Sequence, residues 1–234
     1  MAVPLRHELK FFISPVQYQV LSRTLRATLN GDPHGDENNQ YHIRSLYFDT
    51  INDSALYDKI NGTADREKYR IRIYNFSDSI IRLECKSKFR DLISKRSVAI
   101  SRDLAEQLIS ADPTGLDRTT SGLVGDVFRE MRTHLLHPVV IVDYLREAYL
   151  HPAEEVRITF DMQLRTGLGS CDLFNPRLPT VAPFDHDEII LEVKYNQVLP
   201  PYINNILTFA LRDGATRSAI SKYVWCRRFE FKDF

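Results

Sequence analysis

Polar and apolar residues alternate along several short segments of this chain. In KYRIRIY (68–74), Lys68, Arg70 and Arg72 occupy alternate positions, and tyrosine and isoleucine fill the positions between them. Because successive side chains on a strand point to opposite faces, this pattern predicts a strand with one charged and one apolar face. Patterns of this kind, with β-branched and aromatic enrichment, predict nine strands: 5–13, 41–49, 68–74, 80–88, 95–100, 139–149, 156–164, 188–195 and 223–231.

Four segments instead show apolar residues at helical spacing. The clearest begins at Ser14, an N-cap residue, followed by Pro15 at the first helical position and by Tyr18, Leu21 and later leucines. The other three segments cover 101–111, 122–135 and 202–212. The sequence therefore predicts an α+β protein in which amphipathic helices cover a sheet.

Length and composition predict one ordinary globular domain over 1–234. The chain has 234 residues, of which 43% are apolar, and it shows no internal repeat. Its 31 basic and 31 acidic residues balance, which disfavours a general nucleic-acid binder. Three scattered cysteines and the absence of an apolar leader indicate a cytoplasmic protein that does not insert into a membrane by itself.

Charge alternates in the same way on three further predicted strands. The residues are Arg82, Glu84, Lys86 and Lys88 in one strand, Arg6, Glu8 and Lys10 in a second, and Glu192 and Lys194 in a third. A solvated outer face of an antiparallel sheet would also alternate. However, basic residues dominate these stripes, and like charges on neighbouring strands repel each other unless an anion lies between them. Arginine and lysine supply charge-assisted hydrogen bonds to phosphate, so the stripes favour a phosphate-binding face.

An ordered set of short motifs spans nearly the whole chain. The motifs are RHELKFFI, SLYFDT, YRIRIY, LECKSK followed by ISKRSV, VDYLREAY, VRITFD, LEVKY and SKY. Together they resemble the VTC domain of polyphosphate polymerases, within the CYTH or triphosphate tunnel fold. The resemblance implies an antiparallel eight-stranded β-barrel with basic inner walls and flanking helices. It also implies metal-dependent transfer of the γ-phosphoryl group of ATP to a growing inorganic polyphosphate chain.

The resemblance also implies roles for individual residues. Catalytic roles fall on Arg70, Arg72, Lys86, Arg146 and Arg157. Substrate-binding roles are assigned to Lys10, Arg6, Lys88, Lys95, Arg96, Lys194 and Lys222, where Lys95 and Arg96 compete for one family position. The metal, Mn²⁺ or Mg²⁺, is expected on Glu192, with Glu8 and Glu84 as helpers. For Glu84, a salt bridge with basic neighbours is an equal alternative.

One departure favours the polymerase branch of this fold. Many tunnel triphosphatases carry ExExK in the first strand, whereas this chain has Arg6-x-Glu8-x-Lys10. The seven histidines show no triad or metal spacing, so the sequence offers no clear general base for hydrolysis. A terminal phosphate of polyphosphate is already ionised at neutral pH and needs no such base.

Alternative functions and partners remain open at this stage. A tunnel-type triphosphatase that hydrolyses inorganic triphosphate or a nucleoside triphosphate would use nearly the same residues. A non-catalytic polyphosphate-binding module would need the basic face but not Glu192. The expected ligands are ATP and polyphosphate rather than nucleic acid. Relatives further imply a membrane-bound partner chain that translocates the product, which would place the protein at the inner face of the membrane.

Overall fold

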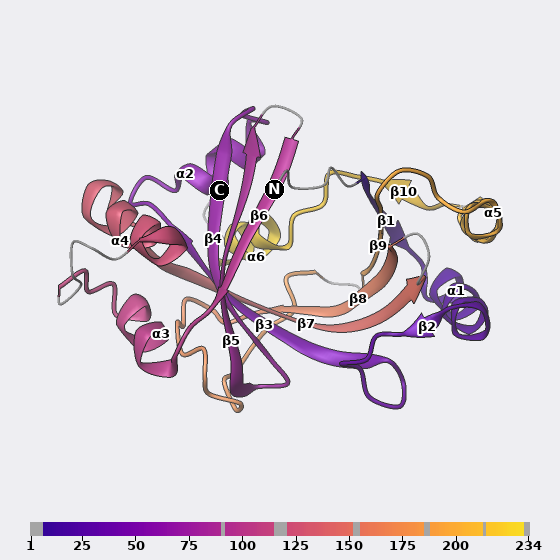
Figure 1. Cartoon of the computed structure of the whole chain (residues 1–234), viewed down its shortest axis with the longest axis horizontal. Helices are drawn as coiled ribbons and strands as arrows, with labels where there is room; N and C mark the ends of the chain where they lie inside the picture. The colour runs from indigo at the N-terminus through magenta and orange to yellow at the C-terminus, as the bar shows by residue number, and fades with distance from the viewer. Residues whose placement is uncertain are drawn as a thin grey trace. The chain divides into compact units, whose positions relative to one another are not determined.

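The structure is a computed structural model, and it describes residues 7–89, 92–114, 121–151, 155–184, 188–212 and 214–231. Arg6 lies outside this set. The ten strands are β1 (His7–Ile13), β2 (Asn30–Gly31), β3 (Gln40–Asp49), β4 (Arg66–Tyr74), β5 (Ser77–Phe89), β6 (Leu92–Ala99), β7 (His137–His151), β8 (Val156–Thr166), β9 (Ile189–Tyr195) and β10 (Thr216–Arg217). The helices are α1 (Pro15–Thr28), α2 (Ser54–Ile60), α3 (Arg102–Ile109), α4 (Gly122–His134), α5 (Pro201–Ala210) and α6 (Lys222–Glu230) (Figure 1).

The strands follow the hydrogen-bonded order β10-β1-β9-β8-β7-β3-β4-β5-β6, and β2 pairs with β7. The predicted α+β architecture with an antiparallel sheet is confirmed. Closure into a barrel requires every strand to have a partner on both sides. Among the described residues the order instead has two ends, β10 and β6, so the sheet is not closed by hydrogen bonds.

The described chain divides into two compact units. Unit 1 consists of Met1–His42, Tyr144–Leu164 and Phe184–Ile220, and unit 2 consists of Ile43–Asp143, Arg165–Pro183 and Ser221–Phe234. Strands β3, β7 and β8 contribute residues to both units. Each predicted charged strand falls within one unit, so each unit has its own charged face.

In unit 1, helices α1 and α5 cover the apolar face of β1, β9 and β8. Helix α1 begins with a capping box, in which Ser14 and Gln17 each bond the backbone N–H of the other. It buries Leu21 and Leu25 completely against residues such as Phe160. Because successive side chains of β8 and β9 point to opposite faces, the charged side chains of these strands lie on the face opposite α1 and α5.

In unit 2, helices α3 and α4 pack on the apolar face of β4, β5 and β6 (Figure 1). Ile71 and Leu83 are fully buried there, together with Val127 of α4. Buried apolar residues occupy every second position of β4 and of β5. The charged residues at the intervening positions therefore lie on the other face of the sheet. The core of unit 2 thus fixes the direction in which the basic side chains project.

The last predicted strand, 223–231, is wrong because this segment forms helix α6. Its aromatic and β-branched residues have high strand propensity, but Ser221 caps the helix by accepting the N–H of Val224. Burial of Tyr223 and Cys226 on one helical face then outweighs local propensity.

Helix α2 was not predicted because it lacks an ordinary N-cap. Asp53 precedes it with a left-handed backbone and makes no side-chain cap bond. Asp49, at the end of β3, accepts the N–H groups of Ala55 and Leu56 at 2.9 and 3.0 Å instead. The Tyr223 hydroxyl also donates to Asp49, which connects α6 to the same carboxylate.

Candidate phosphate-binding site

Basic residues lie opposite one another on the face of β4, β5 and β6 that is turned away from α3 and α4 in unit 2. The cross-strand sets are Arg66 with Lys88, Lys68 with Lys86 and Lys95, Arg70 with Glu84, and Arg72 with Arg82. We call these nine residues the basic face. It holds eight basic side chains and, among these described positions, one carboxylate. Residues directly opposite each other in a sheet project to the same side, so these charges share one surface.

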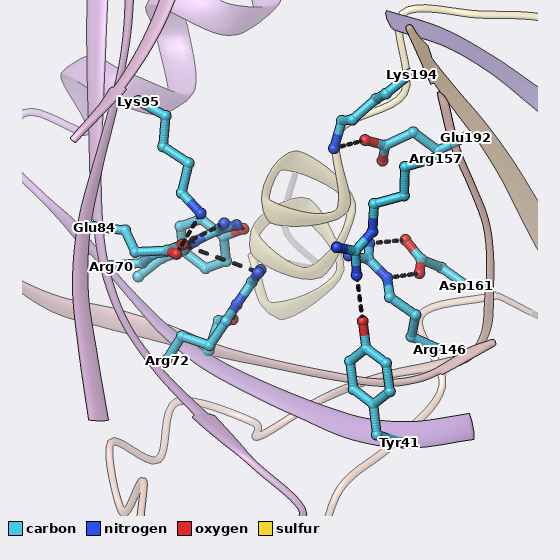
Figure 2. Close-up of polar contacts among 12 residues, drawn as sticks. Tyr41, Arg70, Arg72, Glu84, Lys95, Arg146, Arg157, Asp161, Glu192 and Lys194 are labelled. Carbon is cyan, nitrogen blue, oxygen red and sulfur yellow. Dashed lines mark hydrogen bonds and ion pairs between the residues drawn. The ribbon is translucent and has the colours of Figure 1, made fainter. Parts of the chain in front are cut away.

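Glu84 forms ion pairs with three basic residues of the basic face (Figure 2). Its carboxylate is 2.6 Å from the Arg70 guanidinium, 2.5 Å from the Lys95 ammonium and 3.9 Å from the Arg72 guanidinium. Burial tends to raise the pKa of Glu84, but these three cations outweigh it and hold the pKa well below its usual range. Both oxygens are engaged by cations, which supports the salt-bridge alternative for Glu84 over the expected metal role.

Lys95 has an unusual ionisation for a lysine. Burial of the ammonium, followed by repulsion from Arg70 and Arg72, lowers its pKa to about 8, although Glu84 acts in the opposite direction. The lysine stem is half-exposed, while the ammonium lies against the Glu84 carboxylate. A bound phosphate would therefore favour the charged form of Lys95, which the neighbouring arginines disfavour.

Strand β3 supplies two hydroxyl groups that the sequence analysis did not include in the site. Arg70 donates from Nη1 to the Tyr47 hydroxyl at 2.8 Å, and Arg72 donates from Nε to Ser45 Oγ at 3.0 Å. Burial tends to raise the pKa of Tyr47, but the charges of Arg70, Arg72 and Lys222 outweigh it and lower the pKa. The spacing of two between Ser45 and Tyr47 in SLYFD indicates that these two side chains share one face of β3. The sequence alone did not show which face of β3 would carry them.

Helix α6 of unit 2 begins beside the basic face. The Lys68 ammonium lies 5.6 and 5.0 Å from the ring centroids of Tyr47 and Tyr223, and 3.4 Å from Ser221 Oγ. Lys222, the first residue of α6, contributes to the charge around the Tyr47 phenol. Lys222 is thus brought to the same region as Arg70, as the sequence assignment requires.

Arg96 lies on the other face of β6. It is opposite Cys85, whose side chain is buried in the apolar core, and it forms an ion pair with Asp126 of α4. Lys95 is opposite Lys86 on the basic face. Of the two candidates for one phosphate-binding position, the geometry supports Lys95 and separates Arg96 from the other site residues.

The charged face of unit 1 consists of alternating acids and bases from β1, β7, β8 and β9. We call it the paired face and define it by Glu8, Lys10, Arg146, Arg157, Asp161, Glu192 and Lys194, together with Asp32 from the loop after β2. It holds four basic and four acidic side chains. Each base on this face has an acidic partner within the face.

Glu192 is the most enclosed charged group on β9, at 4% exposure. It forms an ion pair with Lys194 (Figure 2). It also lies 3.9 Å from the Lys10 ammonium, which is itself 3.1 Å from Glu8. Burial tends to raise the pKa of Glu192, but Lys194 and Lys10 outweigh it and hold the pKa well below its usual range. Glu192 therefore stays ionised at neutral pH, as a metal ligand must.

Two buried carboxylates hold the arginines of the paired face. Arg146 forms a two-pronged interaction with Asp161 at 2.6 and 2.8 Å. Arg157 donates from Nη2 to Asp32 at 2.6 Å. It also donates to the Tyr41 hydroxyl at 2.7 Å (Figure 2). Asp32 was not identified from the sequence, because it lies in a polar loop, GDPHGDENNQ, that carries several similar residues.

A divalent cation fits the oxygen atoms around Glu192. Oε1 of Glu192 pairs with the Lys194 ammonium, and the buried hydroxyl of Thr159, directly opposite on β8, has no hydrogen-bond partner among the described residues. No group of three or more His, Cys, Asp or Glu side chains suited to a metal occurs in the described part of the chain. The protein would therefore supply Glu192, aided by Glu8, and phosphate oxygens and water would complete the shell.

The fold of this chain is similar to that of several solved structures of low sequence identity. A Hippeastrum protein first assigned as an adenylyl cyclase, with a dominant triphosphatase activity, has a similar structure: 14% identity, coverage of 94% of both chains and a TM-score of 0.58. Proteins from Bacillus halodurans and Vibrio parahaemolyticus, provisionally named adenylate cyclases, give TM-scores of 0.55 and 0.51 at 12% and 10% identity. Coverage is 94% of both chains for the former, and 96% of this chain and 98% of the other for the latter.

Residues 5–230 match the VTC domain family, and the chain belongs to that family. No curated protein matches the chain. No helix within the described residues has the length and apolar character needed to cross a membrane.

Proposed function

We propose that this protein is a polyphosphate polymerase that transfers the γ-phosphoryl group of ATP to the end of an inorganic polyphosphate chain. The observation that carries the proposal is the basic face, with eight basic residues around one carboxylate on three neighbouring strands. A polyanion is the ligand that relieves this repulsion. Membership of the VTC domain family supports polyphosphate as that polyanion.

In the proposed reaction, a terminal oxygen of the chain attacks the γ-phosphorus of ATP. A new P–O bond forms, the bond to the bridging oxygen of the β-phosphate breaks, and ADP leaves with that oxygen. The family resemblance assigns phosphate binding and charge neutralisation to Arg70 and Arg72 in unit 2 and, separately, to Arg146 and Arg157 in unit 1. The attacking oxygen is already ionised, so no side chain has to remove a proton.

A divalent cation, Mn²⁺ or Mg²⁺, would neutralise phosphate charge when bound at Glu192. The chain's own part is to keep that carboxylate ionised and oriented. Lys10 and Lys194 do so in the structure, through the ion pairs that depress the pKa of Glu192. Glu8 lies beside the same two lysines.

Hydrolysis of inorganic triphosphate or a nucleoside triphosphate is the second candidate. The dominant triphosphatase activity of the structurally similar Hippeastrum protein favours it. Hydrolysis would need a group that orients water, and the carboxylates of the basic and paired faces are already engaged by basic residues. We therefore rank it below phosphoryl transfer.

The proposed reaction takes place in the cytoplasm and uses ATP and polyphosphate. A membrane-bound partner chain that receives the product is part of the proposal, and it rests on the family alone.

The proposal is tested by incubating the purified chain with ATP, Mn²⁺ and a short polyphosphate primer. Products are separated on a gel while ADP and free phosphate are measured. Long chains with ADP and little free phosphate are expected. Free phosphate alone would indicate hydrolysis, and binding without turnover would indicate a polyphosphate-binding module.

A further inference from the structure

Helices α1 and α5 of unit 1 pack side by side on one face of the sheet (Figure 1). Three large apolar residues of these segments are strongly exposed: Val16 of α1 at 71%, Phe209 of α5 at 68%, and Val198, which precedes α5, at 66%. Single exposed apolar side chains are ordinary on a protein surface. A group of them on neighbouring helices instead indicates a surface that binds an apolar partner.

The helical period places the exposed residues of α1 on the side that faces away from the sheet. Val16, Val20 and Arg23 follow one another at spacings of four and three, so they share one side of the helix. The fully buried Leu21 and Leu25 lie on the opposite side. The outward side of α1 therefore combines two valines with one cation.

Helix α5 shows the same arrangement. Phe209 lies on the side opposite the buried Ile203 and Leu207, and Arg212, two residues beyond the end of the helix, is also exposed. The Arg212 guanidinium lies 5.7 Å from the centroid of the Phe209 ring, so an aromatic ring and a cation stand together. We call the exposed set the outer helical surface, and it consists of Val16, Val20, Arg23, Val198, Phe209 and Arg212.

The two segments that carry the outer helical surface have no acidic residues of their own. Neither 14–30 nor 196–212 contains an aspartate or a glutamate, although the chain has 31 acidic residues among its 234. The surface therefore presents apolar side chains and positive charge. A complementary partner has to be both apolar and negatively charged.

Two carboxylates reach these segments from other elements of unit 1. Glu147 lies under α1, where it is fully buried and accepts hydrogen bonds from the Tyr18 and Ser22 hydroxyls. Glu155 accepts a hydrogen bond from Asn196, at the start of the second segment. Both carboxylates are thus engaged within unit 1, so the two arginines set the charge of the outer helical surface.

We infer that the outer helical surface binds a lipid bilayer that carries anionic headgroups. Val16, Val198 and Phe209 enter the boundary between headgroups and acyl chains, and Arg23 and Arg212 stay at the level of the anionic headgroups. The bilayer offers negative charge and an apolar layer at every point of its surface, so no matching shape is required. The inference is independent of the reaction, and it gives this chain a lipid contact of its own.

Flotation of the purified full chain with lipid vesicles tests the inference in the absence of any partner chain. Vesicles of phosphatidylcholine alone are compared with vesicles that also contain about 30% phosphatidylserine, the anionic lipid of cytoplasmic leaflets. The chain is expected to bind the anionic vesicles at least about tenfold more tightly at about 0.1 M salt. This preference should shrink at about 1 M salt, where the Debye length falls to about 3 Å.

Variants distinguish the outer helical surface from other exposed groups. Phe209→Ser is expected to weaken binding to the anionic vesicles by about tenfold, and Arg23→Gln by about fivefold. Ile51→Ser and Arg228→Gln change exposed residues of unit 2 and are the matched controls, which should bind as the wild type does. Lys86→Met removes a charge from the basic face and should also leave vesicle binding unchanged. Circular dichroism confirms that each variant is folded.

Three results would overturn the inference. The first is an absence of binding to the anionic vesicles at about 0.1 M salt. The second is binding that Lys86→Met weakens and Phe209→Ser does not, which would assign the lipid contact to the basic face. The third is a dimer in analytical ultracentrifugation that Phe209→Ser dissociates, which would make a second copy of the chain the partner of this surface.

Discussion

Replacing Glu84 with glutamine removes the one carboxylate of the basic face. Glu84 is 3% exposed, and it lies 2.6 Å from Arg70, 2.5 Å from Lys95 and 3.9 Å from Arg72. The glutamine amide has nearly the same shape but no charge. The variant therefore isolates the electrostatic contribution of Glu84 from its packing.

The expected loss in free energy of unfolding is about 2 kcal/mol at pH 7. Removing one partner of a fully buried ion pair costs about 3–5 kcal/mol, because an uncompensated charge remains. Lys95 is 51% exposed and Arg70 is 22% exposed, so water recovers part of that cost. The loss should therefore fall below the range for a fully buried pair.

The pH dependence gives the sharper test. The folded pKa of Glu84 is depressed, so its stabilisation is present above the unfolded pKa of about 4.3 and is lost as pH falls towards the folded pKa. Urea unfolding of both proteins should show a difference of about 2 kcal/mol at pH 7 that narrows below about pH 4. Equal stability at pH 7, or a difference that does not change with pH, would refute the role assigned to Glu84.

Three further predictions follow from the same contacts. Lys95, whose pKa is lowered to about 8, loses charge as pH rises through that value, so polyphosphate affinity should fall between pH 7 and 9 in the wild type but not in Lys95→Arg; identical profiles would contradict this. Glu192→Gln should weaken Mn²⁺ binding, measured by electron paramagnetic resonance, by about tenfold or more, whereas unchanged binding would exclude Glu192 as a ligand. Arg44→Met leaves the buried Asp143 carboxylate without its two-pronged partner and should cost about 3–5 kcal/mol in urea unfolding, while a loss below about 1 kcal/mol would show that Asp143 finds another partner.

The strands were largely predictable because their charge alternation is strict. The apolar residues Ile71 and Leu83 are fully buried. Their sequence neighbours Arg70 and Glu84 lie on the other face of the sheet, as a period of two requires. The partners of these charges were not predictable in the same way. The contact between Arg70 and Tyr47 depends on the register of β3 against β4, which no local pattern encodes.

Residues outside regular strands were the hardest to assign. Asp32 reaches Arg157 from a loop, and the two are separated by 125 positions in the sequence. Helix α6 was predicted as a strand because its aromatic residues have high strand propensity, whereas the Ser221 cap and the contacts of Tyr223 with Tyr47 and Asp49 favour the helix. In each case a contact distant in sequence contributes to the structure.

The fate of the γ-phosphate of ATP tests the central claim most directly. The purified chain is incubated with Mn²⁺, polyphosphate primer and ATP labelled in its γ-phosphate, and the label is followed by gel electrophoresis and by assay of free phosphate. The proposed function predicts that most of the label enters polyphosphate chains longer than the primer, with one ADP released for each phosphate added. Label that appears only as free phosphate, with no primer extension, would contradict it.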